Sequence, residues 1–146
     1  MRENMGLYRG KRTVNGEWVE GYLTYRYRYD KQSRKEILGP VIDCLQECTI
    51  GNATGKFIGS YQVVPGTEGQ FTGLTDKNGV KIFEGDVVKA ERICNGKAWQ
   101  GIVVWWNGCF AIQGIKDRNV PAIDLFVEYE IIGNIHDNPE LLEVSK

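Results

Sequence analysis

The chain is poor in the residue types on which most enzymes and metal sites depend. Its 146 residues include one histidine, His136, and four cysteines, Cys44, Cys48, Cys94 and Cys109. Nucleophilic catalysis needs a base beside the nucleophile, and a lone histidine next to an expected helix start disfavours that role. The cysteines lack the C-x2-C pairs of structural zinc sites, so a four-thiolate site is the less favoured alternative. We therefore expect no enzyme activity, no metal and no other cofactor.

Long apolar segments are also missing. No run approaches the roughly 18–20 apolar residues of a membrane span, and residues 1–12 contain no apolar region typical of a secretory signal. The sequence therefore predicts a cytoplasmic protein that does not enter the membrane. In that compartment the cysteines are expected to be reduced thiols.

Glycine, by contrast, is abundant and marks turns throughout the chain. There are 18 glycines, and Asn-Gly pairs occur at residues 15–16, 78–79, 95–96 and 107–108. Asn and Gly tolerate the positive φ angles that two-residue type I′ hairpin turns need. Because alternating or β-branched segments flank several of these pairs, the sequence predicts a mainly β protein built of hairpins.

The N-terminal half is predicted to contain antiparallel strands, the first over residues 18–29. Side chains alternate in a strand, so Tyr25, Tyr27 and Tyr29 would share one face and Arg26 and Arg28 the other. We expect the tyrosines to pack inward and the arginines to lie in solvent. Stacking of nucleic-acid bases on the tyrosines is the alternative.

Residues 30–64 are harder to interpret. Residues 30–35 are typical of a loop tip, and residues 40–50 suit either a strand or a short helical turn. Residues 51–57 resemble a phosphate-binding loop, but Phe57 stands where Ser or Thr should hold magnesium. We therefore predict a hairpin loop over residues 51–56 and a strand over residues 57–64.

Residues 67–135 are predicted to form a small SH3-like β-barrel. Short β-branched and aromatic segments alternate there with glycines, which allow the bends that close a small barrel. Trp105 and Trp106 would face opposite sides of a strand, so one needs a cover: the N-terminal strands, a second subunit or a ligand. Residues 76–79 suit a turn better than a calcium loop, because further ligands are missing. The expected interior residues are Phe83, Val87, Val103, Trp105, Phe110 and Ile112.

One short helix is expected at the C-terminus. A residue before proline is disfavoured in the α region, so Asn138 suits the N-cap and Pro139 the first helical position. Such a short helix is marginal alone and must dock through Leu141 and Leu142. The predicted organisation is an N-terminal β subdomain (1–66), the barrel region (67–135) and a docking helix (136–146).

Charge is unevenly distributed along the chain. Residues 1–35 hold nine Lys and Arg against four Asp and Glu, a net charge of +5, whereas residues 117–146 hold two against seven, a net charge of −5. A solvated surface is the plainest interpretation, with head-to-tail association of subunits or polyanion binding as alternatives. The basic residues proposed to contact a partner or nucleic acid are Arg9, Lys11, Arg12, Arg26 and Arg28.

Three separated blocks of the sequence resemble the YopX family of phage and prophage proteins. They lie at residues 9–23, at residues 64–88 with the segment GQFTGL, and at residues 130–142 with the segment EIIGNIHDNPELL. Residues 24–60 lie outside these motifs, and Glu68 replaces an aliphatic residue. The resemblance implies a small β-rich protein encoded by a phage or an integrated element in a bacterial host, with no catalytic residues to carry over.

The sequence thus favours an interaction protein over an enzyme. We expect a phage- or prophage-encoded protein that self-associates or binds a protein partner, because small β proteins leave strand edges that must be capped or paired. The alternative is a nucleic-acid-binding module that uses the basic N-terminal residues. The sequence pI near 5.9 disfavours that alternative, and nothing in the sequence indicates a small-molecule substrate.

Overall fold

A computed structural model describes residues 6–91, 98–116, 121–123 and 127–143. The chain divides into two compact units, Arg2–Gln70 and Phe71–Lys146. Both are built of antiparallel strands with almost no helix, which confirms the prediction of a mainly β protein. The boundary falls inside one strand, β5 (Gly69–Thr75), whereas the sequence placed it at residues 66–67.

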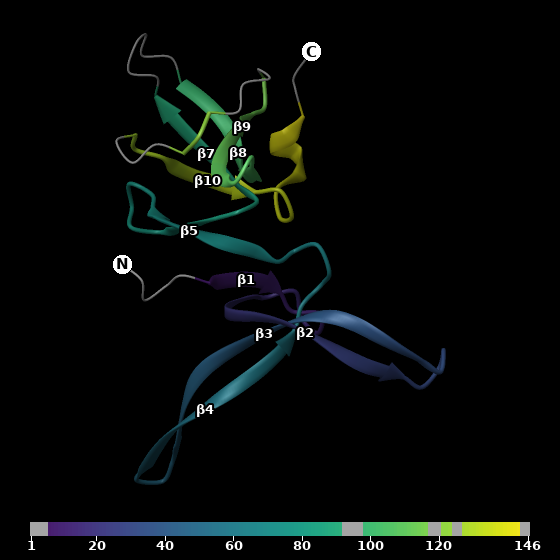
Figure 1. Ribbon diagram of the computed structural model, residues 1–146. Helices are drawn as coiled ribbons and strands as arrows, with labels where there is room; N and C mark the ends of the chain where they lie inside the picture. Colours follow the sequence, from purple (N-terminus) through teal and green to yellow (C-terminus); the bar gives the residue numbers. More distant parts are fainter. Residues whose placement is uncertain (1–5, 92–97, 117–120, 124–126, 144–146) are drawn as a thin grey trace. The chain divides into compact units, whose positions relative to one another are not determined.

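The N-terminal unit consists of four strands in the order β4-β3-β2-β1 (Figure 1). They are β1 (Leu7–Lys11), β2 (Trp18–Asp30), β3 (Lys35–Ile50) and β4 (Ala53–Gln62). Gly69 and Gln70, at the start of β5, pair with β1. The 40–50 segment is therefore a strand and not a helical turn, and the predicted loop over 51–56 shrinks to a turn at Gly51 and Asn52.

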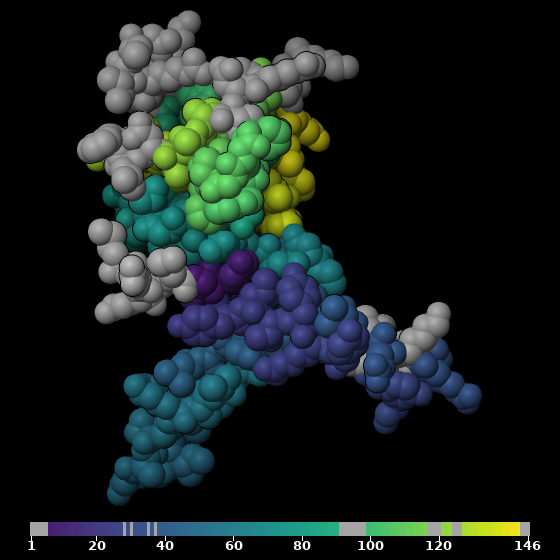
Figure 2. All heavy atoms as spheres, viewed as in Figure 1, coloured from purple at the N-terminus to yellow at the C-terminus, as the bar shows by residue number. Residues whose placement is uncertain are grey.

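Strand β3 is shared between two hairpins that diverge from each other. Its first half pairs with β2 and its second half with β4, and only residues Val41, Ile42 and Asp43 pair on both sides. Beyond these three residues each hairpin continues as a two-stranded ribbon. We call residues 25–40 the first arm and residues 44–59 the second arm; Figure 2 shows them as separate projections.

Glycines allow the strands of the N-terminal unit to approach closely where the arms meet. A Cβ atom on Gly21 would lie 2.3 Å from the carbonyl oxygen of Asp43, and one on Gly10 would lie 2.8 Å from the Val63 side chain. Ile42 and Val63 are buried beside these glycines. The small core of this unit therefore depends on the missing side chains of Gly10 and Gly21.

The C-terminal unit contains the rest of β5, which forms a hairpin with β6, and a four-stranded sheet in the order β10-β7-β8-β9. The strands are β6 (Lys81–Phe83), β7 (Asp86–Glu91), β8 (Ala98–Trp106), β9 (Cys109–Gly114) and β10 (Glu130–Asn134). Asn107 and Gly108 both have positive φ, as predicted for the β8–β9 turn. Within the described residues this sheet is open, with β10 and β9 at its edges, so the SH3-like barrel remains a prediction.

The core of the C-terminal unit matches the expected interior at four of six positions. Phe83, Val87, Val103 and Ile112 are buried. The prediction for Trp105 is wrong, because 54% of its surface is exposed. Trp105 lies at the end of β8 beyond the packed centre of the sheet, where its ring contacts the half-buried Phe110 edge-on at 4.9 Å.

The turn at residues 76–79 is organised by a buried carboxylate. Asp76 accepts hydrogen bonds from the backbone N–H groups of Asn78 and Val80, each at 2.9 Å, and from Ile131 at 3.2 Å. Burial alone would raise the pKa of Asp76. The hydrogen bonds from these N–H donors together lower the pKa by more than burial raises it, so the pKa of Asp76 lies below its usual value. The predicted turn is thus a structural link between the β5–β6 hairpin and β10.

The C-terminal helix is shorter and tighter than an α-helix. Residues Pro139–Leu142 form a 3-10 helix with Asn138 at its N-cap. The Asn138 side chain accepts a hydrogen bond from the Asn134 backbone instead of capping the helix. Across the described part of the chain, no helix has the length and apolar character needed to cross a membrane.

Candidate interaction surface

The arms of the N-terminal unit carry large apolar side chains that the protein does not bury. A two-stranded ribbon has no layer packed on either face, and isolated hairpins of this kind are marginal in water. Groups of exposed apolar side chains often mark sites that a partner covers. The exposed apolar residues of the two arms are Tyr25, Tyr27, Tyr29, Leu38, Leu45, Ile50, Phe57 and Ile58.

The tyrosines of the first arm were predicted to pack inward, and this prediction is wrong. Tyr25, Tyr27 and Tyr29 are all exposed, Tyr27 by 72%. Their strand leaves the sheet centre, so the face that they share has no layer above it. Tyr27 pairs only with Leu38 across the hairpin. Partial burial of the Tyr25 side chain and the nearby Glu68 carboxylate, 3.3 Å from the Tyr25 hydroxyl, raise the pKa of Tyr25.

The five basic residues that the sequence proposed as a contact surface have different partners in the structure. The guanidinium of Arg9 lies 4.6 Å and the ammonium of Lys11 5.6 Å from the centre of the Trp18 ring. Arg12 stacks on Tyr61 at 4.4 Å. Each of these cations lies over an aromatic face, which contributes about 0.5–1 kcal/mol at exposed sites.

Arg26 and Arg28 belong to the first arm. Arg26 pairs with Asp43 at 2.6 Å and bonds the Ser60 hydroxyl at 3.1 Å, so its charge is already compensated. Arg28 lies two residues further along β2, opposite Ile37. A phosphate-binding role for Arg26 would therefore require that its bond with Asp43 open.

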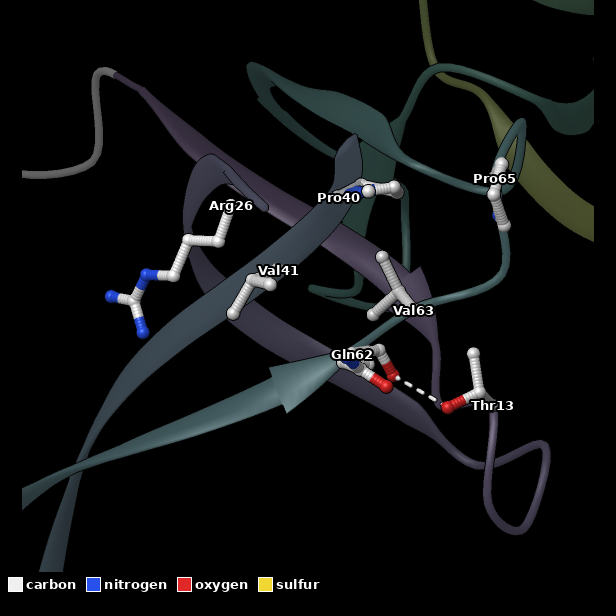
Figure 3. Close-up of a pocket in the computed structure, with 8 residues that line it drawn as sticks. Thr13, Arg26, Pro40, Val41, Gln62, Val63 and Pro65 are labelled. Carbon is white, nitrogen blue, oxygen red and sulfur yellow. Dashed lines mark hydrogen bonds between the residues drawn. The ribbon is translucent and has the colours of Figure 1, made fainter. Parts of the chain in front are cut away.

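A hollow of about 210 Å³ lies where the arms meet (Figure 3). Val41, Val63 and two prolines make its walls mostly apolar, and the Arg26 guanidinium extends to the side away from Val63. Because its one charged lining residue is paired with Asp43, the hollow offers little to orient a charged small molecule. The full lining is Thr13, Arg26, Gly39, Pro40, Val41, Gln62, Val63 and Pro65.

The outer edge of β4 is the other open feature of this unit. β4 is the last strand in the sheet order, and its ten pairs with β3 run without a bulge. It contains no proline, and Lys56 is its one charged residue. Natural proteins usually protect such edges with bulges, prolines, charges or a covering segment. Thr13 donates a backbone hydrogen bond to Gln62 at the end of β4, but among the described residues no strand pairs with the edge over residues 53–61.

The C-terminal unit protects its edge strand β9 differently. Ile112 donates a backbone hydrogen bond to Pro121, and Ile123 donates one to Phe110. Residues 121–123 therefore cover β9. In the part of the chain that the structure describes, β9 is therefore covered by a short segment, whereas most of the outer edge of β4 is not.

The thiols do not gather into a site. Cys44 and Cys48 lie four residues apart on β3, and Cys109 starts β9; Cys94 lies outside the described residues. Burial and the neighbouring Asp43 raise the pKa of Cys44, against an opposing effect of Arg12. Within the described ranges no three His, Cys, Asp or Glu side chains come together as metal ligands would.

Sequence reasoning missed the second arm. Leu45 and Ile50 lie in residues 40–50, for which a strand and a short helical turn were both left open. Phe57 and Ile58 lie in the predicted strand over residues 57–64, but their exposure was not predicted, because the sequence does not show that the hairpin extends beyond the sheet.

Comparison with known proteins identifies a family, and solved structures are similar as well. The YopX protein family model matches residues 7–143, nearly the whole chain. The crystal structure of protein EF1440 from Enterococcus faecalis is similar, with 29% identity and a TM-score of 0.50, and the match covers 93% of this chain and 96% of that one. No curated protein matches the chain.

Proposed function

The chain belongs to the YopX protein family, and from that premise we propose that it is a non-enzymatic interaction protein that associates with copies of itself. The observation that carries the proposal is the unburied apolar surface of the two arms. These side chains are presented by a folded, paired backbone, so a partner would meet an ordered surface rather than a disordered segment.

The energetic case for a partner rests on the size of these side chains. Burying one residue as large as Ile58 or Phe57 contributes roughly 1.5–3 kcal/mol. Ile58 is 69% exposed and pairs with Leu45, which is 65% exposed, so the two form one apolar spot on the second arm. Such spots on both arms are enough to offset the cost of association, which is about 4–15 kcal/mol.

Charge favours a second copy of the chain as the partner. Residues 25–40, the first arm, carry five Lys and Arg against two Asp and Glu, a net charge of +3, whereas residues 117–146 carry −5. Unlike charges on two copies attract each other and fix their orientation. A nucleic acid is the weaker alternative, because three of the five basic residues stack on aromatic rings and Arg26 is paired with Asp43.

The family and the site suggest the setting of this role. We propose that the protein is encoded by a phage or prophage and acts in the cytoplasm of the bacterial host. The expected absence of enzyme activity rests on the single histidine and on the scattered carboxylates and thiols of the described residues.

Replacement of Ile58 by lysine tests the proposal. We expect the wild-type protein to have an oligomeric mass in light scattering, and Ile58→Lys to raise the dissociation constant at least about 100-fold, because each copy loses roughly 1.5–3 kcal/mol of apolar burial. Val14→Lys is the matched control, since Val14 is 84% exposed in a turn outside both arms. It should associate like the wild type.

Two outcomes would contradict self-association. A wild-type protein that stays monomeric up to high concentration would end the proposal. Monomers that bind heparin, with an affinity that falls steeply as salt rises, would instead support the nucleic-acid alternative.

A further inference from the structure

We propose that the open edge of β4 pairs antiparallel with β4 of a second copy, which joins the two N-terminal sheets across a two-fold axis at Phe57. This inference rests on the proposed self-association and specifies its interface. It starts from the contrast between β9, which residues 121–123 cover, and β4, which no described strand covers.

The backbone of β4 determines which groups are available. Gly51 and Asn52 form a two-residue turn closed by the pair Ile50 and Ala53. In such a hairpin the closing pair exchanges both backbone hydrogen bonds, and the bonding direction then alternates along the strand. Thr54, Lys56, Ile58 and Ser60 therefore direct their N–H and C=O groups away from β3.

Symmetry and charge select one register. An antiparallel pair of identical strands needs a two-fold axis at a residue, so that outward groups meet outward groups. An axis at Lys56 would place two like charges opposite each other, which is unfavourable. An axis at Phe57 instead pairs Lys56 with Ile58 and Thr54 with Ser60 of the second copy. An axis at Ile58 would need the outward groups of Gln62, whose carbonyl already accepts a hydrogen bond from Thr13, so the axis at Phe57 is favoured.

The side chains around Phe57 suit this axis. Phe57 would lie opposite its own copy, and aromatic pairs of this kind stabilise antiparallel sheets. On the same face its neighbours along β4 are Gly55 and Gly59. A Cβ on Gly55 would meet nothing within 4 Å, whereas the side chains of Gln46 and Tyr61 already lie beside Gly59. The space for a second ring is therefore on the Gly55 side of Phe57. Residues 44–59 also have no net charge, because Glu47 and Lys56 are their only charged residues. These two pair at 3.7 Å, so the second arms of two copies would not repel each other.

Disulfide formation at Phe57 tests the register directly. In full-length protein with the four native cysteines replaced by serine, Phe57→Cys would place two thiols in facing positions within the distance that a disulfide spans. Under mild oxidation we expect more than about half of the chains to form a covalent dimer on a non-reducing gel, while the Gly55→Cys control stays below about a tenth, because residues 55 of the two copies would lie four positions apart.

The results separate this inference from the proposed function. If the cysteine-free parent is oligomeric but Phe57→Cys cross-links no better than Gly55→Cys, the β4 pairing is wrong and self-association stands. If that parent and the wild type are monomeric, both are wrong. Exchange of backbone amide hydrogens gives a second measurement on the wild type: residues 54–60 should exchange at least about tenfold more slowly in the oligomer than after dilution to monomer, and unchanged exchange would contradict the pairing.

Discussion

Replacement of Gly21 by alanine is expected to lower the stability of the N-terminal unit by about 3 kcal/mol, at the upper end of the usual effect of overpacking. The added Cβ would lie 2.3 Å from the backbone oxygen of Asp43 and 2.9 Å from Ile42. A backbone oxygen cannot rotate away as a side chain can, so β2 and β3 would have to separate. The Asp43–Arg26 pair and the buried Ile42 would be disturbed together.

Gly39→Ala is the matched control for this substitution. Gly39 lies in β3 of the same sheet, but a Cβ there meets nothing within 4 Å. Its effect should stay within about 1 kcal/mol and can be stabilising, because alanine restricts the unfolded chain more than glycine does. Urea unfolding followed by circular dichroism would compare the two, and equal midpoints would refute the close-approach explanation.

Asp76→Ala is expected to destabilise the C-terminal unit by about 2–4 kcal/mol. The substitution leaves the N–H groups of Asn78, Val80 and Ile131 without their carboxylate acceptor in a site where Asp76 itself is only 7% exposed. Hydrogen bonds to a charged group contribute about 1.5–3 kcal/mol each, and buried donors without partners are costly. Unfolding followed by tryptophan fluorescence would report the loss, because Trp99 packs against the core of this unit.

Two further variants test the cause of that loss. Asp76→Asn keeps one acceptor oxygen and should cost less than Asp76→Ala. Lys77→Ala removes only the partly exposed ion pair with Glu130 and should change stability by no more than about 0.5 kcal/mol. A loss in Lys77→Ala as large as that in Asp76→Ala would mean that the turn as a whole, and not the carboxylate, determines stability.

The same carboxylate makes the stability of the C-terminal unit depend on pH. The pKa of Asp76 is lowered in the folded protein, so its stabilising contribution is fully present above the unfolded value of about 3.9. The contribution is lost as pH falls through the lower, folded pKa. Wild type should therefore lose stability in this acidic range more steeply than Asp76→Asn does, and parallel curves for the two proteins would contradict this assignment.

The sequence predicted turns better than it predicted exposure. Asn107 and Gly108 fixed a hairpin because their positive φ angles are rare outside such turns, and Pro139 marked a helix start for a similar local reason. Burial depends on what lies above a strand. The alternation of Tyr25, Tyr27 and Tyr29 correctly identified a shared face, but nothing in the residues themselves shows that no second layer covers that face.

The same limit explains the other differences. Trp105 is two residues from the buried Val103 and therefore lies on the same face of β8. However, Trp105 is one residue pair from the end of the β8–β9 hairpin, beyond the core. The basic residues were grouped by their proximity in sequence, whereas their aromatic and acidic neighbours come from distant strands, such as Tyr61 beside Arg12 and Asp43 beside Arg26. Long-range pairing of this kind is not encoded in the spacing of the charges.

The long strand β3 implies a gradient of protection along one continuous segment. Its residues Val41, Ile42 and Asp43 are held on both sides, while the segments on either side of them are held by a single neighbour and end in turns. Backbone amides near Ile42 should thus open only with the whole unit, and those towards Lys35 and Ile50 should open progressively more easily. Both hairpins would fray from their tips towards this common centre. Because β3 is one continuous strand through both hairpins, a change of its twist at the centre would change the direction of both arms.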